Sequence, residues 1–332
     1  MAIVFSKSSN VNNSFFGKSQ EPIKMLLDRE VDAFKEMSAI PKLFKEIKSN
    51  NFAEKLVSRT ALSSFENVEE GGDYPEGNMQ EGYSKVIEPF TWKLSFAITR
   101  EMIEDNKLID MQGSALGFID AYNRTRERYA GAMLAGGVGT TISFDGVTYD
   151  TKCADGKALF AKDHPSITSG TAAQSNLFAD AFTEDALGAA ECAMQGFKDD
   201  NGNVLNVSPD TIVIPNNYAL KKEVFKVIGA DKDPNTSNNG YNFQFGRWNV
   251  IVWPYLAAVS GAAAPWILMD SKYNKSRGTA VWDERIPLEV SSYIEEKNDN
   301  NVWKGYARFG IGFNNWRGMA IGGVTGGTTL IG

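Results

Sequence analysis

The clearest regular spacing of apolar side chains lies between residues 183 and 229. Thr183 is placed to cap a helix, and Asn217 is placed to cap a second one. The apolar faces of these two helices comprise Leu187, Ala190, Met194 and Phe197 in the first and Leu220, Val224 and Ile228 in the second. Between them, Thr211–Ile214 is an apolar run too short for a helix, which predicts a buried strand. We expect Gly229 to end the second helix in a left-handed conformation. The pattern predicts helices layered on a small sheet.

Two further segments alternate apolar and polar positions with the period of a strand. Phe90–Ile98 predicts a strand with one apolar face, and we expect it to form a long hairpin with residues 58–65. The acidic, turn-rich residues 69–82 would make the polar tip of that hairpin. Residues 281–293 and 302–313 predict a second hairpin around a polar turn.

Helical spacing returns in two other places. Residues 110–134 predict a long helix that ends at Gly136. Its apolar face comprises Met111, Ala115, Phe118, Ile119, Tyr122, Tyr129 and Met133. Residues 22–47 follow an approximately helical repeat broken near Pro41, which predicts a helix pair or a kinked helix. Residues 230–241 read as a polar loop, and residues 322–332 as a turn and tail.

Four motifs occur in an order that resembles the major head subunits of tailed bacteriophages. They are Ala158-Leu159-Phe160 followed by Asp163-His164-Pro165; Asn176-Leu177; the Ala-rich helix after Thr183; and Ser208-Pro209-Asp210 before a strand that ends at Pro215. Within that group the sequence is most similar to the phage Mu type. The resemblance implies the Hong Kong 97 shell fold, an α+β fold with an N-terminal arm, an extended hairpin loop, a long spine helix, a peripheral domain and an axial domain.

The resemblance also implies a division of the chain. Residues 1–57 would form the N-terminal arm and helices, and residues 58–98 the extended loop, which in similar proteins lies over the adjacent subunit. Residues 99–165 and 276–312 would form the peripheral domain with the spine helix, which a short helix at residues 99–106 would precede. Residues 166–275 and 313–332 would form the axial domain, with the loop 230–241 near the symmetry axis of a capsomer.

Composition narrows the function classes. The net charge of −7 argues against a protein whose main task is to grip nucleic acid, but suits one that encloses it. Cys153 and Cys192 are the only cysteines, and the N-terminus lacks the pattern of a signal peptide, so we expect a reducing cytoplasmic compartment.

Residues 250–269 carry no charge, yet prolines and small residues interrupt them. Two buried strands around a loop fit this segment better than a membrane span.

The sequence offers little catalytic chemistry. His164 is the only histidine, and no second histidine, H-E-x-x-H or G-x-S-x-G motif supplies a partner, so a structural, hydrogen-bonded role is favoured over a hydrolase. The glycine-rich segments near residues 310 and 322 lack the features of nucleotide-binding loops. We expect Asp199-Asp200 and the cluster Arg124, Arg126 and Arg128 to be solvated, rather than calcium ligands and a nucleic-acid patch. No cofactor or metal is expected.

These observations lead to one favoured function and two rivals. The favoured one is a non-enzymatic major capsid protein that forms hexamers and pentamers of an icosahedral phage head around double-stranded DNA, without sequence-specific binding. The expected partners are further copies of the chain, with scaffold, portal and decoration proteins as others and no membrane. The product would reside in the virion after assembly in the bacterial cytoplasm. The rivals are an encapsulin-type shell around a cargo enzyme, and a hydrolase that uses His164. The candidate inter-subunit contacts are Asp73, Tyr74, Pro75, Glu76, Lys85, Trp92, Asn298, Asp299 and Asn300.

Overall fold

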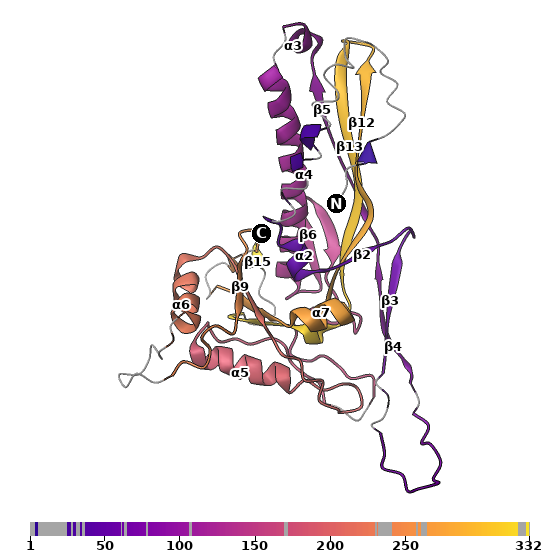
Figure 1. Ribbon diagram of the computed structural model, residues 1–332, viewed down its shortest axis with the longest axis vertical. Helices are drawn as coiled ribbons and strands as arrows, with labels where there is room; N and C mark the ends of the chain where they lie inside the picture. Colours follow the sequence, from indigo (N-terminus) through magenta and orange to yellow (C-terminus); the bar gives the residue numbers. More distant parts are fainter. Residues whose placement is uncertain are drawn as a thin grey trace.

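The computed structural model is an elongated molecule with a projecting loop (Figure 1). It describes residues 4–5, 25–27, 29–30, 34, 37–60, 62, 65–77, 79–105, 108–168, 172–229, 231, 241–256, 258–259, 264–324 and 330–331. The predicted loop 230–241 therefore lies almost wholly outside the described residues, as does much of the tail after residue 324. Among the described residues, no helix combines the length and the apolar character needed to cross a membrane.

A long sheet forms one side of the molecule. Its strands lie in the order β1 (Val4–Phe5), β12 (Ala280–Glu295), β13 (Asn300–Phe313) and β5 (Phe90–Ile98), and β2 (Lys45–Lys48) also pairs with β12. β12 and β13 form the predicted hairpin, in antiparallel register from Ala280 opposite Phe313 to Glu295 opposite Asn300. β1 and β2 join β12 in parallel. This hairpin is the longest pair of strands in Figure 1.

The long helix α4 (Leu108–Gly136) runs beside this sheet, after the short helix α3 (Arg100–Glu104) that Thr99 caps. Both helices confirm the prediction, and every residue of the predicted apolar face of α4 is buried. Aromatic rings fill the space between helix and sheet: Tyr129 lies 5.2 Å from Trp92, which stacks on Phe309 at 5.1 Å. A small hairpin, β6 (Thr141–Phe144) and β7 (Val147–Asp150), completes this part.

The expectation that Arg124, Arg126 and Arg128 are solvated is wrong for Arg126, while Arg124 and Arg128 are exposed. Arg126 is buried and lies over the ring of Trp282, 4.9 Å from its centre, and 3.7 Å from the carboxylate of Glu284. Glu127 is buried as well; it accepts hydrogen bonds from Ser38 and from the indole of Trp253, the latter at 2.7 Å. The helix therefore has contacts on more than one face, which the apolar pattern alone does not reveal.

The helix–strand–helix segment builds the second region. Its sheet has the order β14 (Met319–Gly322), β11 (Trp266–Met269), β8 (Thr211–Ile214) and β9 (Asn249–Val252), covered by α5 (Glu184–Gln195) and α6 (Tyr218–Ile228). Thr183 and Asn217 cap the two helices as predicted. Residues 250–269 contain the two predicted strands, β9 and β11, with the short strand β10 between them; β11 is buried as predicted, whereas β9 is not. The prediction for Gly229 is wrong: its φ of −94° is right-handed, so α6 ends without a left-handed residue.

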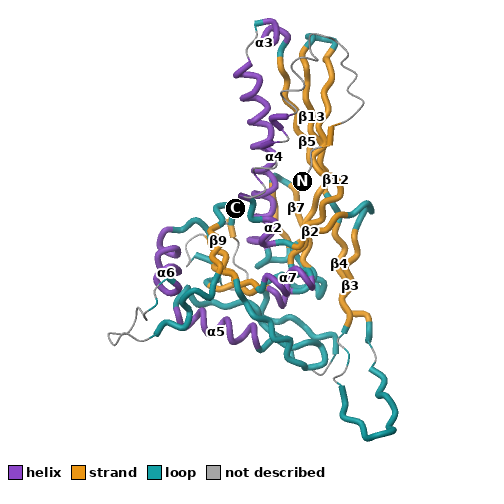
Figure 2. Tube along the Cα trace, in the orientation of Figure 1, coloured by secondary structure: helices purple, strands orange, loops and turns teal. Residues whose placement is uncertain are grey.

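The extended loop pairs differently from the prediction. β3 (Glu54–Arg59) pairs with β4 (Glu81–Ile87), not with the predicted strand Phe90–Ile98, which instead joins β13 as β5. The apolar face of β5 thereby packs on α4 through Trp92 and Phe96. Figure 2 shows the resulting loop as a long stretch without helix or strand beyond the two paired strands.

The remaining elements connect these parts. Described residues between 25 and 37 are helical, and α2 (Ile40–Leu43) follows the break near Pro41, as predicted. The helical pattern does not continue to residue 47, because Lys45–Lys48 is the strand β2. A short helix α7 (Ser271–Arg277) links β11 to β12, and the 3₁₀ turn η1 (Trp316–Gly318) precedes β14. β10 (Ala258–Val259) pairs with β15 (Leu330–Ile331).

Candidate functional site

The extended loop is a hairpin closed at its base and open beyond it. Thr60 and Gln80 form two hydrogen bonds. The backbone N–H of Thr60 donates to the Gln80 carbonyl at 3.0 Å, and the Thr60 hydroxyl accepts from the Gln80 N–H at 2.9 Å. Ser58 donates to the carbonyl of Tyr83 at 2.8 Å one step closer to the body. Beyond this closure every described residue from 62 to 81 is exposed. Leu62 and Met79 border a cavity shared with α7 and η1, and the described residues between them are open to solvent.

Four predicted contact residues lie together on this loop. Asp73, Tyr74, Pro75 and Glu76 follow a turn in which the Gly72 N–H donates to the Glu69 carbonyl at 2.9 Å. The exposed fraction of Tyr74 is 97%. The other large apolar side chains exposed on the loop are Leu62, Phe65, Val68 and Met79. Such a density of exposed apolar groups on one segment marks an interaction surface.

Lys85 lies at the foot of the loop, inside its own subunit. Its ammonium group donates to Asp150 at 2.8 Å and to the carbonyl of Lys152 at 2.7 Å, and only 8% of the residue is exposed. Trp92 is also turned inward, since its ring stacks on Phe309 and its N–H donates to the Phe309 carbonyl at 3.3 Å. Both residues fix the loop strands and β5 to the body of the subunit.

The other predicted contacts form the turn between β12 and β13. Asp299 adopts a positive φ of 55°, its N–H donates to the Glu295 carbonyl at 2.9 Å, and its carboxylate lies 2.9 Å from Arg100. Asn298 donates to the Glu295 carboxylate, and the N–H of Asn300 donates to Asn298. This turn and the extended loop lie at opposite ends of the molecule (Figure 1). The structure thus separates the sequence-predicted residues into two exposed tips and an interior group.

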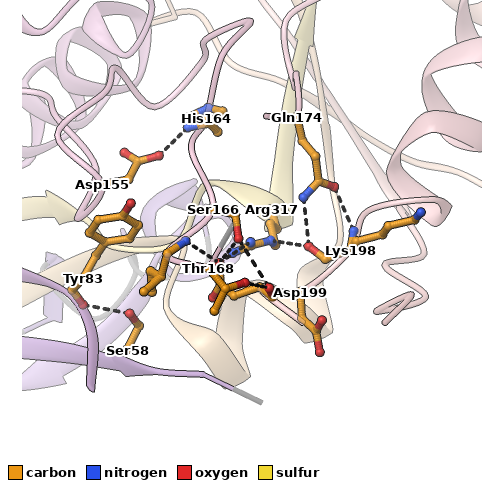
Figure 3. A network of polar contacts seen from close by, with 12 residues as sticks. Ser58, Tyr83, Asp155, His164, Ser166, Thr168, Gln174, Lys198, Asp199 and Arg317 are labelled. Atoms are coloured by element: carbon orange, nitrogen blue, oxygen red, sulfur yellow. Dashed lines mark hydrogen bonds and ion pairs between the residues drawn. The ribbon is translucent and has the colours of Figure 1, made fainter. Parts of the chain in front are cut away.

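His164 occupies a closed polar site between the two regions (Figure 3). Only 1% of it is exposed; Nδ1 lies 2.7 Å from the Asp155 carboxylate and Nε2 lies 3.1 Å from Oδ1 of Asn176. The Asn176 amide is oriented by the Ala161 N–H, which donates to Oδ1, and by the Met319 carbonyl, which accepts from Nδ2. The imidazole also stacks on Trp316 at 4.3 Å. These contacts confirm the predicted structural role.

A second group of contacts in Figure 3 lies around Ser166, Asp199 and Arg317. The Asp200 carboxylate accepts from the Ser166 hydroxyl at 3.3 Å and lies 3.4 Å from Arg317, while Asp199 accepts from the backbone N–H groups of Asn201 and Asn203. Both aspartates are buried, so the expectation of solvation is wrong. Burial and the nearby carboxylates Asp155 and Asp200 raise the pKa of Tyr83, which lies in the same network at the foot of the loop.

The described residues contain no arrangement suited to catalysis or metal binding. No cluster of three or more histidine, cysteine, aspartate or glutamate side chains in this part of the chain has the geometry of a metal site. Both cysteines are free, and burial raises the pKa of the Cys153 thiol well above its usual value, which keeps it unreactive. The polar networks hold segments together, and Tyr83, Asp200 and Arg317 also line a cavity of about 610 Å³ at the foot of the loop.

Sequence reasoning missed the outer face of α6. Tyr218 and Phe225 are exposed there, and the nearby segment exposes Tyr241, Phe243 and Phe245. The signal was present in the sequence, because aromatic residues at positions 218 and 225 fall on the face opposite the buried Leu220 and Val224. These aromatic side chains form a further exposed apolar surface.

Comparisons with known proteins assign the chain to a family. Residues 82–322, which are more than half of the chain, match the family model described as phage capsid protein. A comparison with curated proteins finds no match.

Solved structures share the fold at low sequence identity. The procapsid subunit of bacteriophage JBD30 is 15% identical with a TM-score of 0.52, over 95% of this chain and 77% of that one. The capsid subunit of Ralstonia phage GP4 is 10% identical with a TM-score of 0.52, over 86% and 88%. A chain of Mycobacterium phage Patience is 10% identical with a TM-score of 0.51, over 100% and 95%.

These likenesses confirm the α+β fold of tailed-phage capsid subunits, while the Mu-type likeness stays a prediction from the sequence. They give no support to an encapsulin or a hydrolase. The chain therefore belongs to the phage capsid protein family and is a structural major capsid protein, not an enzyme.

Proposed function

We propose that copies of this chain assemble as hexamers and pentamers into an icosahedral head that encloses double-stranded DNA. The observation that carries the proposal is the extended loop, in which every described residue from 62 to 81 is exposed. An isolated subunit leaves Phe65 and Tyr74 in water, and a neighbouring subunit is the surface that would cover them in a shell. The subunit is therefore stabilised by interfaces as well as by its own core.

The elongated shape of the subunit supports the division that we propose (Figure 1). The arm before residue 58, the extended loop, the region around α4 and the β12–β13 hairpin, and the region around α5 and α6 would act as arm, loop, peripheral domain and axial domain. The exposed aromatics of α6 support contacts between axial domains around a capsomer axis. The two polar tips support a further proposal, that both hairpins shift as a precursor shell matures.

The same proposal covers location and partners. Assembly would take place in the cytoplasm of a bacterial host, with a scaffold, a portal and decoration proteins as partners, and the finished subunit would reside in the virion. The net charge of −7 supports enclosure of DNA without tight or sequence-specific binding, since an acidic lining repels phosphates.

Electron microscopy of the purified chain tests the proposal. Closed particles with hexamers and pentamers, which retain nuclease-protected DNA when formed in infected cells, are the expected result. Particles that contain a protein cargo and no DNA would support the encapsulin alternative. A chain that stays monomeric at high concentration, with and without its scaffold, would refute the assembly function.

A further inference from the structure

The extended loop joins the body of the subunit at a root made of residues 54–57 and 84–89. The first pair of residues in its ladder is Glu54 of β3 and Ile87 of β4. The chain then crosses to β5 over Gly310 of β13, where an added Cβ atom would lie 2.8 Å from a backbone oxygen of the crossover. The root therefore lies directly on the sheet of β12 and β13, and a glycine permits this close approach.

Asp283 lies beneath the root. It pairs with Gly310 across β12 and β13, and the side chains of paired residues point to the same face of a sheet. The Asp283 carboxyl is therefore on the face that the root covers. It is fully buried, and neither oxygen has a hydrogen-bond partner among the described residues. Because a buried carboxylate without donors is costly, the closed root favours the protonated form of this group.

A second carboxylate in the root opposes ionisation of Asp283. Glu54 accepts hydrogen bonds from Ser49 and from Asn51, the latter at 2.8 Å, and these bonds lower the pKa of Glu54. Glu54 is therefore ionised at neutral pH. Burial and then the charge of Glu54, opposed by the charge of Arg285, raise the pKa of Asp283 to about 6.

Two cations on neighbouring strands are bound to other groups. Arg308 of β13 donates to the Pro89 carbonyl at 3.3 Å, and Lys45 of β2 donates to the Ser276 carbonyl at 3.1 Å. The remaining charged residues described on β2, on β3 and in the crossover are exposed: Glu46, Lys48, Lys55 and Glu88. None of these groups neutralises an ionised Asp283 while the root is closed.

Arg285 is the rival partner for an ionised Asp283. One of its nitrogens, Nη1, is buried and has no hydrogen-bond partner among the described residues. Arg285 lies in the register shift between Glu284 and Ile286, which breaks the alternation of side chains along β12. The two groups form no hydrogen bond in this part of the chain, although both lack partners. Water admitted by movement of the root is then the remaining source of donors.

The root has room to move. Val57, Leu62 and Met79 of the loop border the cavity of about 610 Å³, so the ladder beyond the root stands beside open space. Lys85 anchors β4 through Asp150 at 2.8 Å, and this ion pair does not involve Asp283. The root can therefore separate from β13 while β4 stays attached to the body of the subunit.

We infer that Asp283 is a proton-controlled latch for the extended loop, with the root closed while the carboxyl is protonated and released when it ionises. Opening exposes the carboxyl to water and returns its pKa to the ordinary value of 3.8. The stability of the closed root is therefore full below pH 3.8 and is lost as the pH rises to about 6. Between pH 5 and pH 8 the equilibrium should shift toward the open root by about tenfold. This regulation acts within one subunit and goes beyond the assembly function.

Hydrogen exchange of the unassembled full-length chain tests the latch. Exchange rates at pH 5 and pH 8 are divided by those of an unstructured peptide at the same pH, which removes the direct effect of pH. In wild type, the protection of the amides of residues 54–57 and 84–88 should fall by about tenfold from pH 5 to pH 8. Asp283→Asn should keep its protection at pH 8, and Glu54→Gln should show a smaller fall than wild type. Glu289→Gln, which changes an exposed carboxylate on the same strand, is the control and should match wild type.

Three results would overturn the latch. Constant protection of the root in wild type would mean that an ionised Asp283 finds a partner, such as Arg285, with the root closed. A tenfold fall that persists in Asp283→Asn would assign the opening to another group. Root amides that exchange as slowly as those of the buried strand β8 at both pH values would show that only global unfolding exposes Asp283. The chain is measured before assembly, so the result is independent of whether it forms shells.

Discussion

The buried carboxyl of Asp283 makes the stability of the subunit depend on pH. Asp283 lies on β12 between Gly310 of β13 and Ile47 of β2, and it is fully buried. Neither of its carboxylate oxygens has a hydrogen-bond partner among the described residues. Burial and then the charge of Glu54, opposed by Arg285, raise the pKa of Asp283 from 3.8 to about 6. Replacing this residue by Asn keeps the shape of the side chain and removes the charge.

The sign and size of the effect follow from this pKa. Between pH 3.8 and about 6 the folded state binds more protons than the unfolded state, so the free energy of unfolding falls as the pH rises. The rise of roughly two pKa units sets an upper limit of about 3 kcal/mol. Solvent near the half-buried Glu54 and the charge of Arg285 screen the group, so we expect about 1–2 kcal/mol. Asp283→Asn should therefore be more stable than wild type at pH 8 and lose this advantage near pH 4.

Thermal unfolding measured at pH 4.5, 6 and 8, with wild type and variant in the same assembly state, tests this reasoning. The difference in unfolding temperature should grow from pH 4.5 to pH 8. Glu46→Gln, at an exposed position on the adjacent strand β2, is the control and should show no such trend. An Asp283→Asn variant with the same unfolding temperature as wild type at all three pH values would refute the claim that ionisation of the buried Asp283 carboxyl destabilises the folded state.

Three further predictions concern contacts within the subunit. Asp150→Ala should destabilise the subunit by about 1–3 kcal/mol, because it leaves the buried Lys85 ammonium with a single carbonyl partner. Lys85→Met should destabilise it less, and chemical denaturation that gives the reverse order would contradict the ion-pair argument. A Cβ atom on Gly322 would lie 2.1 Å from the ring of Trp266, so Gly322→Ala should lower the free energy of unfolding by about 1–3 kcal/mol. An unchanged unfolding midpoint would show that the ring has room to move. His164→Ala should cost about 2–4 kcal/mol, since it removes a stacked ring and leaves buried hydrogen-bonding groups unpaired; unchanged urea unfolding would argue against a structural role.

Local signals in the sequence were sufficient where the structure is local. Thr183 and Asn217 cap their helices through side-chain bonds to N–H groups three residues ahead, and such bonds need no distant partner. The apolar face of α4 was equally visible, because helical periodicity records which side is covered. Gly229 shows the limit of this approach: a glycine permits a left-handed cap but does not require one.

Pairing between distant strands was not predictable from the same signals. The alternation in Phe90–Ile98 identifies a strand and its apolar face, but says nothing of the partner, which lies more than 200 residues later in β13. Lys45–Lys48 became a strand for the same reason, since its partner is β12. A four-residue segment carries too little pattern to outweigh the helical repeat before it.

The candidate site was recognisable in part. The acidic, turn-rich loop stood out by composition, and the structure places its residues 73–76 in the open. The burial of Lys85 could not be predicted from the sequence, because a lysine in a strand is usually solvated and its partner Asp150 lies 65 residues away. The proximity of Lys42, Arg247 and Lys275 could not be foreseen either, since these three residues meet only in the folded chain.

The central claim is that this subunit is completed by its neighbours, and the position of the extended loop in an assembled particle tests it most directly. A reconstruction of the purified shell by electron cryo-microscopy should show residues 62–81 of each copy covered by an adjacent copy, with Phe65 and Tyr74 no longer exposed to solvent. Loops that remain free in closed shells, or that fold back onto their own subunit, would contradict the account.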